Sequence, residues 1–409
     1  MKVVSNSPKI GEFKSTVNLI LTAVGVGVLA LPKAIAQSGW AIGVVLLLAT
    51  WGLSQFMMHL LWKCIESEKR RGGAAIKSYG CIGEAALGKF GRYMVSFAMY
   101  LGLSAICVII LILLGQGLFL LTSTLTMSAW IRIAALCILP LSWLPTLKEV
   151  GVLSAVGVVA VCIVGIVVVI ASISMDADVR GEISAVPTSA AGLAMSFIEF
   201  MNSFTVAPVI PTIIVGMNDS SKYPRVAAYG FGVITLAFAI IGFAGYAGWG
   251  SALLAKDGGN ITSQISKGGS LTLSTICQVS IIVVSLSHFL VMFNPVGLLM
   301  DSLVGLAPIE HKVAKVSLKM LGRSCVVGLM LLLALFVPSF GTIVDLVGST
   351  VVLPLQVIFP ILFFCLLCKD ELLSMSALKR GLFQALFAVA VAVALVAMGY
   401  GLYNVIMNW

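Results

Sequence analysis

One stretch near the start of the chain decides the fold: Thr22-Ala-Val-Gly-Val-Gly-Val-Leu-Ala-Leu-Pro32. It lies inside an apolar segment of membrane length, yet it carries Gly25 and Gly27 where an ordinary membrane helix would use Leu, Ile or Val. Backbone that leaves the helix within a bilayer must bury its freed N–H and C=O groups in protein or in a wet cavity. The stretch therefore predicts a helix that opens inside the membrane, which is typical of a transporter binding site.

The rest of the chain also has the composition of a membrane protein. Of its 409 residues, 60% are hydrophobic and 10% are charged, and the mean hydropathy is +1.12. A soluble protein carries about 25% charged residues. Apolar blocks of membrane-helix length occur eleven times, near residues 15–36, 40–62, 92–121, 130–147, 150–174, 188–216, 226–250, 271–300, 318–337, 342–367 and 382–405. We predict an all-α polytopic membrane protein, with a tail at 1–14 and one transmembrane domain at 15–409.

The net charge of +9 follows the predicted topology of the chain. Most of the 25 Lys and Arg residues fall on one side of the predicted bilayer, as at Lys69, Arg70 and Arg71 after the second block. Because basic residues are enriched in cytoplasmic loops, this distribution places the N-terminus in the cytosol. It indicates a lipid bilayer as the partner and no nucleic acid. The plasma membrane and a vacuolar or lysosomal membrane both fit the pattern.

A second segment is interrupted in a comparable way. Residues 188–216 contain Pro208 and Pro211, and each proline removes a backbone donor and disturbs the preceding turn. The interrupted segments are the first and the sixth, so each begins a run of five. This arrangement predicts two inverted repeats, 15–174 and 188–367, and one extra helix at 382–405. Gly and Pro that only kink a helix or allow close packing are the alternative interpretation.

Short motifs occur in order along nearly the whole chain. They are Asn18 with Gly25 to Ala34, Ser78-Tyr79-Gly80, Glu84 to Gly88 with Gly91-Arg92, Leu144 to Glu149, Phe204 with Pro211, Met217 to Pro224, Val337 to Gly341, and Leu346-Val-Gly348. In this combination the chain resembles the amino acid/auxin permease family, within the amino acid–polyamine–organocation superfamily. The resemblance implies a leucine-transporter-like fold and alternating-access transport of an amino acid, driven by an ion gradient.

An amino acid offers a carboxylate and an ammonium group to its site. The carboxylate suits the N–H groups freed at the glycine break, and the ammonium needs freed carbonyls or a hydroxyl. The predicted substrate-binding residues are Thr22, Val24, Gly25, Val26, Gly27, Phe204, Thr205 and Val206. The family usually carries a small pair where Thr205-Val206 stands, so this chain departs from the family pattern there.

Three residues are candidates for ion coupling: Glu199, Ser287 and Leu21. Sodium-coupled members of the family carry a hydroxyl where Ser287 stands, but they have an asparagine where this chain has Leu21. Since Na⁺ needs oxygen ligands, the leucine favours H⁺ over Na⁺. Glu199 lies within the sixth segment, where a charge is costly, and it is interpreted either as a proton carrier or as a neutral residue that ties helices together.

Two further polar residues are interpreted as structural. His288 in the eighth segment is expected to pack against neighbouring helices. Lys33 closes the first segment and is expected to extend its amine to the membrane interface, as long basic side chains near helix ends do.

The predicted function is proton-coupled amino acid symport. Sodium-coupled symport is the alternative, and an amino acid sensor or a channel are alternatives of another class. A channel would need filter loops or pore-lining rings, and a sensor would normally need a longer soluble tail. We expect no enzymatic activity, no cofactor and no metal site, because the sequence lacks HExxH, GxSxG and paired carboxylates at helical spacing.

Overall fold

The computed structural model describes residues 9–73, 76–122, 124–143, 147–175, 180–255, 260–268, 270–304, 312–337 and 340–408. Within these ranges, nine helices are long and apolar enough to cross a membrane. The pair Glu12–Ala23 and Gly27–Ser38, bent by 53°, is long and apolar enough when the two helices are taken together as one broken span. The shorter apolar helix Met127–Ser142 occupies the remaining predicted segment. Each of the eleven predicted segments therefore contains helix within the described residues.

The first half of the chain forms the first five spans. Its elements are α1 (Glu12–Ala23), η1 (Val26–Ala30), α2 (Leu31–Ser38), α3 (Trp40–Arg70), α4 (Tyr79–Thr122), α5 (Met127–Ser142) and α6 (Leu147–Ile173). Local sequence sets several of the element ends. The hydroxyl of Thr126 accepts a hydrogen bond from the Ala129 N–H and caps α5. Gly88 has a φ of +65°, a conformation that suits glycine, and α4 bends there.

The second half contains the remaining spans and the short elements between them. These are α7 (Ala190–Ser203), η2 (Ala207–Val209), α8 (Ile210–Gly216), η3 (Ser220–Lys222), α9 (Tyr223–Trp249), η4 (Gly250–Leu254), α10 (Ile261–Lys267), α11 (Leu271–Leu303), α12 (Lys312–Phe336), α13 (Phe340–Val347), η5 (Gly348–Val352), η6 (Pro354–Ile358), α14 (Phe359–Leu367), α15 (Lys369–Ser374) and α16 (Ala377–Asn408). Elements η5 and η6 are π-helical, whereas η1 to η4 are short 3₁₀ helices.

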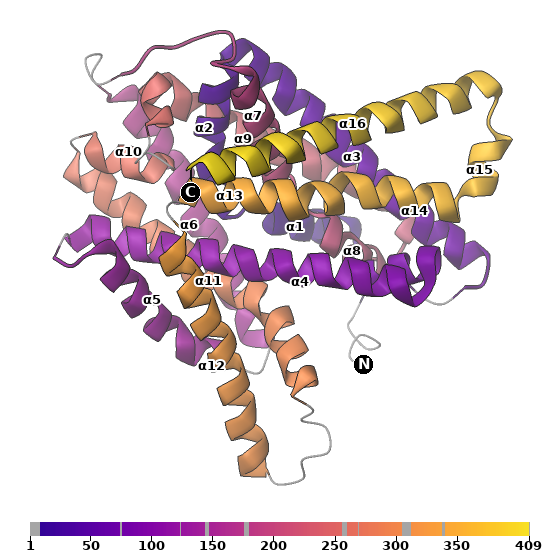
Figure 1. The fold of residues 1–409 in the computed structure, drawn as a ribbon, viewed down its shortest axis with the longest axis horizontal. Helices are drawn as coiled ribbons and strands as arrows, with labels where there is room; N and C mark the ends of the chain where they lie inside the picture. The colour runs from indigo at the N-terminus through magenta and orange to yellow at the C-terminus, as the bar shows by residue number, and fades with distance from the viewer. Residues whose placement is uncertain are drawn as a thin grey trace.

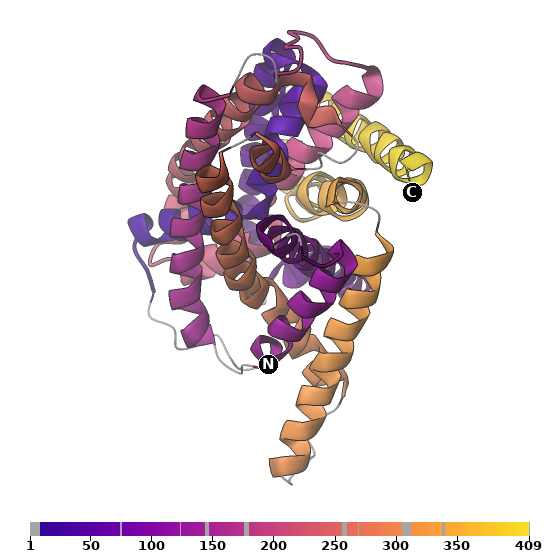
Figure 2. The ribbon, with the colours of Figure 1, turned by 90° about the vertical axis from the view of Figure 1, so that its left-hand side faces the viewer.

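The helices form one bundle around the two interrupted spans. Figure 1 shows α13 and α14 lying alongside α16, with α15 joining them at one end. In both views α12 projects from one end of the bundle (Figures 1 and 2). The interrupted spans, α1–η1–α2 and α7–η2–α8, are in contact near their breaks, where α2 packs on α7.

The start of the first interrupted span is linked to the end of the second at one end of the bundle. Ile10, just before α1, pairs with Met217 after α8 in the single β-bridge of the described residues. The Ile10 N–H donates to the Gly216 carbonyl at 2.9 Å, and the Ile10 carbonyl accepts from Asn218 at 3.0 Å. Nearby, the Lys222 amine lies 2.9 Å from Glu12. These contacts fix the entry of α1 against the exit of the sixth span.

Candidate functional site

The break in the first span begins at Val24. This residue and Gly25 adopt extended backbone, with φ, ψ of −83°, 92° and −137°, −152°, before the chain turns into η1. Among the described residues, the Gly25 N–H and the carbonyls of Leu21 and Val24 have no backbone hydrogen-bond partner. The break therefore presents unpaired N–H donors beside unpaired carbonyl acceptors, as the glycine pattern predicts.

The break in the sixth span lies between Phe204 and Val206. Pro208 has no N–H, so it cannot supply the bond that the Phe204 carbonyl would accept in a continuous helix. The Val206 carbonyl accepts from the Val209 N–H at 3.0 Å. In this part of the described structure, the Thr205 carbonyl and the Val206 N–H remain without a partner.

Gln356, from η6 in the tenth span, replaces the backbone hydrogen bond that Pro208 cannot make. Its amide Nε2 donates to the Phe204 carbonyl at 2.9 Å, and its Oε1 accepts from the Ala207 N–H at 3.2 Å. The side chain is fully buried. A single amide thus satisfies one acceptor and one donor on opposite sides of the sixth-span break.

The two breaks are connected through Ser203, the last residue of α7. Its hydroxyl lies 3.3 Å from the Gly27 carbonyl and 3.0 Å from the carbonyl of Glu199, one turn earlier. A Cβ added to Gly27 would meet the Cα of Ser203 at 3.5 Å. A single methyl group at Gly27 would therefore make ordinary van der Waals contact with Ser203.

One turn from this contact, Lys33 of α2 meets two buried carboxylates. Its Nζ lies 2.8 Å from Oε1 of Glu199 and 4.0 Å from Oδ2 of Asp345 in α13. The expectation that Lys33 extends to the membrane interface is wrong, because its side chain is only 15% exposed and ends on Glu199. The amide of Asn404 in α16 lies 3.5 Å from the Oδ2 of Asp345. We call Lys33, Glu199 and Asp345 the charged cluster.

With all three groups ionised, the charged cluster carries a net charge of −1. Glu199 Oε2 and Asp345 Oδ1 are buried and have no hydrogen-bond partner among the described residues. An uncompensated buried charge is costly. Binding one proton makes the cluster neutral while Lys33 keeps a carboxylate partner. The geometry therefore allows the uptake of a single proton.

The other predicted ion-coupling residues are placed differently. The Ser287 hydroxyl in α11 donates within its own helix to the carbonyls of Val283 and Val284, at 2.9 and 3.0 Å. It faces Gly157 of α6, where an added Cβ would lie 2.2 Å from its oxygen. Leu21 adds only a backbone carbonyl to the first break. His288, the next residue of α11, packs its ring against Gly25, where an added Cβ would lie 2.9 Å from Cε1.

The structure places part of the predicted substrate set at the two breaks. The backbones of Val24, Gly25 and Gly27 line one break, and those of Thr205 and Val206 line the other. The hydroxyl of Thr22 donates to Asn18, and that of Thr205 donates to Met201, so both bond within α1 or the end of α7. The carbonyl of Phe204 is already bonded to Gln356. Val26 contributes backbone to η1.

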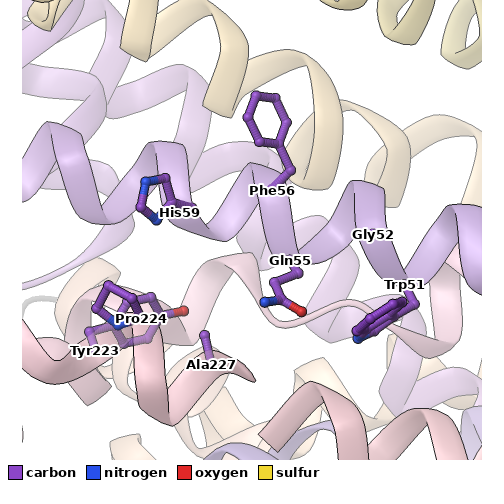
Figure 3. Close-up of a pocket in the computed structure, with 8 residues that line it drawn as sticks. All are labelled: Trp51, Gly52, Gln55, Phe56, His59, Tyr223, Pro224 and Ala227. Carbon is purple, nitrogen blue, oxygen red and sulfur yellow. The ribbon is translucent and has the colours of Figure 1, made fainter. Parts of the chain in front are cut away.

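The cavity beside the first break is small. A cavity of about 10 Å³ lies beside Gly25, between η1, α6 and α11. A cavity of about 390 Å³ lies elsewhere, between α3 and α9 (Figure 3). It is lined by Trp51, Gly52, Gln55, Phe56, His59, Tyr223, Pro224 and Ala227. None of these eight residues is an acid, a lysine or part of a helix break, and the polar side chains among them are Gln55, His59, Tyr223 and the indole of Trp51.

The sequence did not identify the role of Gln356 or the charged cluster that joins Lys33 to Glu199 and Asp345. Gln356 is a polar residue between Pro354 and Pro360 in an apolar span, and this signal was present in the sequence. Lys33 and Glu199 carry opposite charges on the two interrupted spans, which was a second signal. The role of Gln356 and the role of Lys33 each depend on a partner more than 140 residues away in the sequence.

Comparison with known proteins places these features in a family. The sequence model described as "Transmembrane amino acid transporter protein" matches residues 8–407. The chain is 27% identical over 372 residues to the amino acid transporter AVT1E of Arabidopsis thaliana, covering 88% of this chain and 67% of AVT1E. It is 27% identical over 393 residues to the amino acid transporter AVT3C of the same plant, covering 89% of this chain and 85% of AVT3C. The chain spans 64% of a third relative, AVT1D.

Two solved structures share the fold. One is a Na⁺-coupled sialic acid symporter in a substrate-bound outward-open state, with a TM-score of 0.54 and 13% identity over 85% of this chain and 79% of the symporter. The other is MHP1, a nucleobase-cation-symport-1 family transporter in a closed conformation, with a TM-score of 0.52 and 15% identity over 99% of this chain and 96% of MHP1. These likenesses confirm the predicted all-helical, leucine-transporter-like fold.

Proposed function

Because the chain belongs to the transmembrane amino acid transporter family, we propose that it moves an amino acid across a membrane by alternating access, as a proton-coupled symporter. In this proposal residues 15–174 and 188–367 are the two repeats, and 382–405 is the extra helix. The N-terminus faces the cytosol, in keeping with the distribution of Lys and Arg. The observation that carries the proposal is the meeting of two helix breaks beside a buried charged cluster.

The backbone groups at the two breaks suit the two ends of an amino acid. The free Gly25 N–H is a donor for the carboxylate, and glycine lets the ligand approach the backbone. The free carbonyls of Val24 and Thr205 are acceptors for the ammonium group. A substrate that bridges these groups would hold the two interrupted spans together, which is what an alternating-access carrier requires.

Proton coupling is supported by the charge of the cluster. Its ionised form has a net charge of −1 and binds one proton to become neutral, and Glu199 lies one turn from Ser203, which contacts the first break. Sodium is less well served, because Leu21 offers no side-chain oxygen and the Ser287 hydroxyl bonds within its own helix. Glu199 is therefore the proposed proton carrier.

The test uses purified protein in liposomes with choline replacing sodium. An acidic outside should drive amino acid accumulation by the wild type. Glu199→Gln removes the titrating group while Asp345 remains to pair with Lys33, so it should lose accumulation but retain counterflow exchange. Glu84→Gln, which removes one carboxylate of an exposed pair with Arg92, is the matched control and should behave as the wild type.

Sodium-dependent uptake with a normal pH response in Glu199→Gln would overturn the proton assignment. Sodium dependence abolished by Ser287→Ala would then place the coupling ion between the first and eighth spans. Transport without saturation or counterflow would indicate a channel instead of a carrier.

A further inference from the structure

The sixth-span break is held open by a residue from another helix. In a continuous helix the Phe204 carbonyl would accept from position 208 and the Ala207 N–H would donate to position 203. Pro208 has no N–H to offer, and Ala207 is bonded elsewhere. The Gln356 amide takes both places, at 2.9 and 3.2 Å, with no exposed surface. Among the described groups at this break, the carbonyls of Ser203 and Thr205 and the Val206 N–H are left for other partners.

The backbone that carries Gln356 is itself unusual. The Leu353 N–H donates to the Gly348 carbonyl, and the Phe359 N–H donates to the Pro354 carbonyl, so both bonds span five residues. Such π-helical turns are rare and occur mostly at functional sites. Gln356 lies between Pro354 and Phe359, in the second π-helical stretch, and faces the break of the sixth span. The tenth span is thus locally widened where its glutamine reaches the break.

We infer that Gln356 is a positioning residue of the substrate site, an inference that rests on the proposed function. By bonding the residues on either side of Thr205 and Val206, it fixes the direction of the Thr205 carbonyl, the acceptor for the substrate ammonium. Gln356 does not touch the substrate itself. Loss of its amide lets the peptide units of the break rotate, so that this acceptor no longer meets the ammonium group.

The test compares two ligands of the purified protein. One is the amino acid that binds best in a panel, and the other is its analogue with hydrogen in place of the α-amino group. Gln356→Leu should weaken binding of the amino acid by about tenfold, the loss expected for one hydrogen bond to a charged group. Binding of the analogue should change little. Gln55→Leu, at the separate cavity between α3 and α9, is the matched control and should keep the wild-type ratio of affinities.

A second variant separates positioning from simple packing. In Gln356→Glu, a neutral carboxyl group has one O–H donor and one carbonyl acceptor, the same pair as the amide. An ionised carboxylate would instead face the Phe204 carbonyl with no hydrogen to donate. For Gln356→Glu, the affinity for the amino acid relative to the affinity for the analogue should therefore return toward the wild-type value as the pH falls. Both proteins are measured at each pH.

Two outcomes overturn the inference in distinguishable ways. A wild-type ratio in Gln356→Leu, or no recovery of Gln356→Glu at low pH, would overturn the role of Gln356 while leaving the proposed function intact. A wild-type protein that binds no amino acid in the panel would overturn the proposed function and the inference with it.

Discussion

The break in the first span and the break in the sixth span leave similar backbone groups free, but they are held in different ways. At the first, Gly25 packs against the His288 ring of α11, and the side-chain hydrogen bond that the described residues show there, from Ser203 to the Gly27 carbonyl, reaches one side of the break. At the sixth, the Gln356 amide bonds to both Phe204 and Ala207. The sixth break is braced by hydrogen bonds, and the first is shaped by close packing.

This difference suggests a division of roles. Hydrogen bonds fix orientation, so the braced break is suited to hold an acceptor in one direction. Packing of a glycine against a side chain constrains the direction of the backbone less than hydrogen bonds do. The first break is therefore suited to move and to close on a ligand. Ser203 and the charged cluster connect the two breaks. Variants at each element therefore test the contrast separately.

The largest effect on stability is expected from Lys33→Met, which removes the cation between the two spans. Glu199 would then be buried without a side-chain partner and Asp345 would keep only the Asn404 amide, and breaking a buried pair costs about 3–5 kcal/mol. A thermal unfolding scan in detergent should show a large fall in Tm. The fall should shrink as the pH is lowered, because protonation of both carboxylates removes their charge.

Lys222→Met is the control for this prediction, since the same substitution there breaks an exposed pair with Glu12 and should change Tm little. An equal Tm for Lys33→Met and the wild type at neutral pH would show that the cluster does not join the spans.

A smaller effect is expected from Gly25→Ala at the first break. The new Cβ would lie 2.9 Å from Cε1 of His288, so the ring must shift. Overpacking of this kind costs about 1–3 kcal/mol, and it should reduce amino acid affinity by about tenfold. Equilibrium binding to the purified variant measures the loss. Adding His288→Ser should restore part of the affinity by making room.

Gly232→Ala in α9 is the control, because an added Cβ there meets nothing within 4 Å. If the double variant binds no better than Gly25→Ala alone, the ring of His288 is not what limits space at the first break.

The smallest effect is expected from Thr205→Val at the sixth break. The Thr205 hydroxyl donates to the Met201 carbonyl at 2.9 Å, so its loss removes one local bond and leaves the Gln356 brace in place. Affinity for the amino acid should stay within about threefold of the wild type. A tenfold loss would mean that the hydroxyl binds the substrate directly, which is the role suggested by the sequence alone.

The sequence predicted the spans and the breaks because both depend on local chemistry. Hydrophobic length identified all eleven segments, and Gly25, Gly27 and Pro208 marked the interruptions. The resemblance to a family then supplied the fold. These features require no knowledge of which helices touch.

The partners at the breaks depend on long-range contacts, and the sequence could not supply them. Gln356 is 149 residues from Ala207, and Lys33 is 166 residues from Glu199. A lysine near the end of a membrane helix usually extends to the interface, and this rule failed for Lys33 because two carboxylates lie nearby in the fold. The same limit applies to His288, whose packing against Gly25 was expected only in general terms.

The central claim, that an amino acid binds where the two breaks meet, is tested most directly by Gly27→Val. A Cβ at Gly27 lies 3.5 Å from Ser203, and the two methyl groups of valine would fill the space between the spans. Radiolabelled amino acid binding should be saturable for the wild type and for Gly232→Val, and at least about 100-fold weaker for Gly27→Val, with Tm values that show all three folded. Wild-type affinity in folded Gly27→Val would contradict the account.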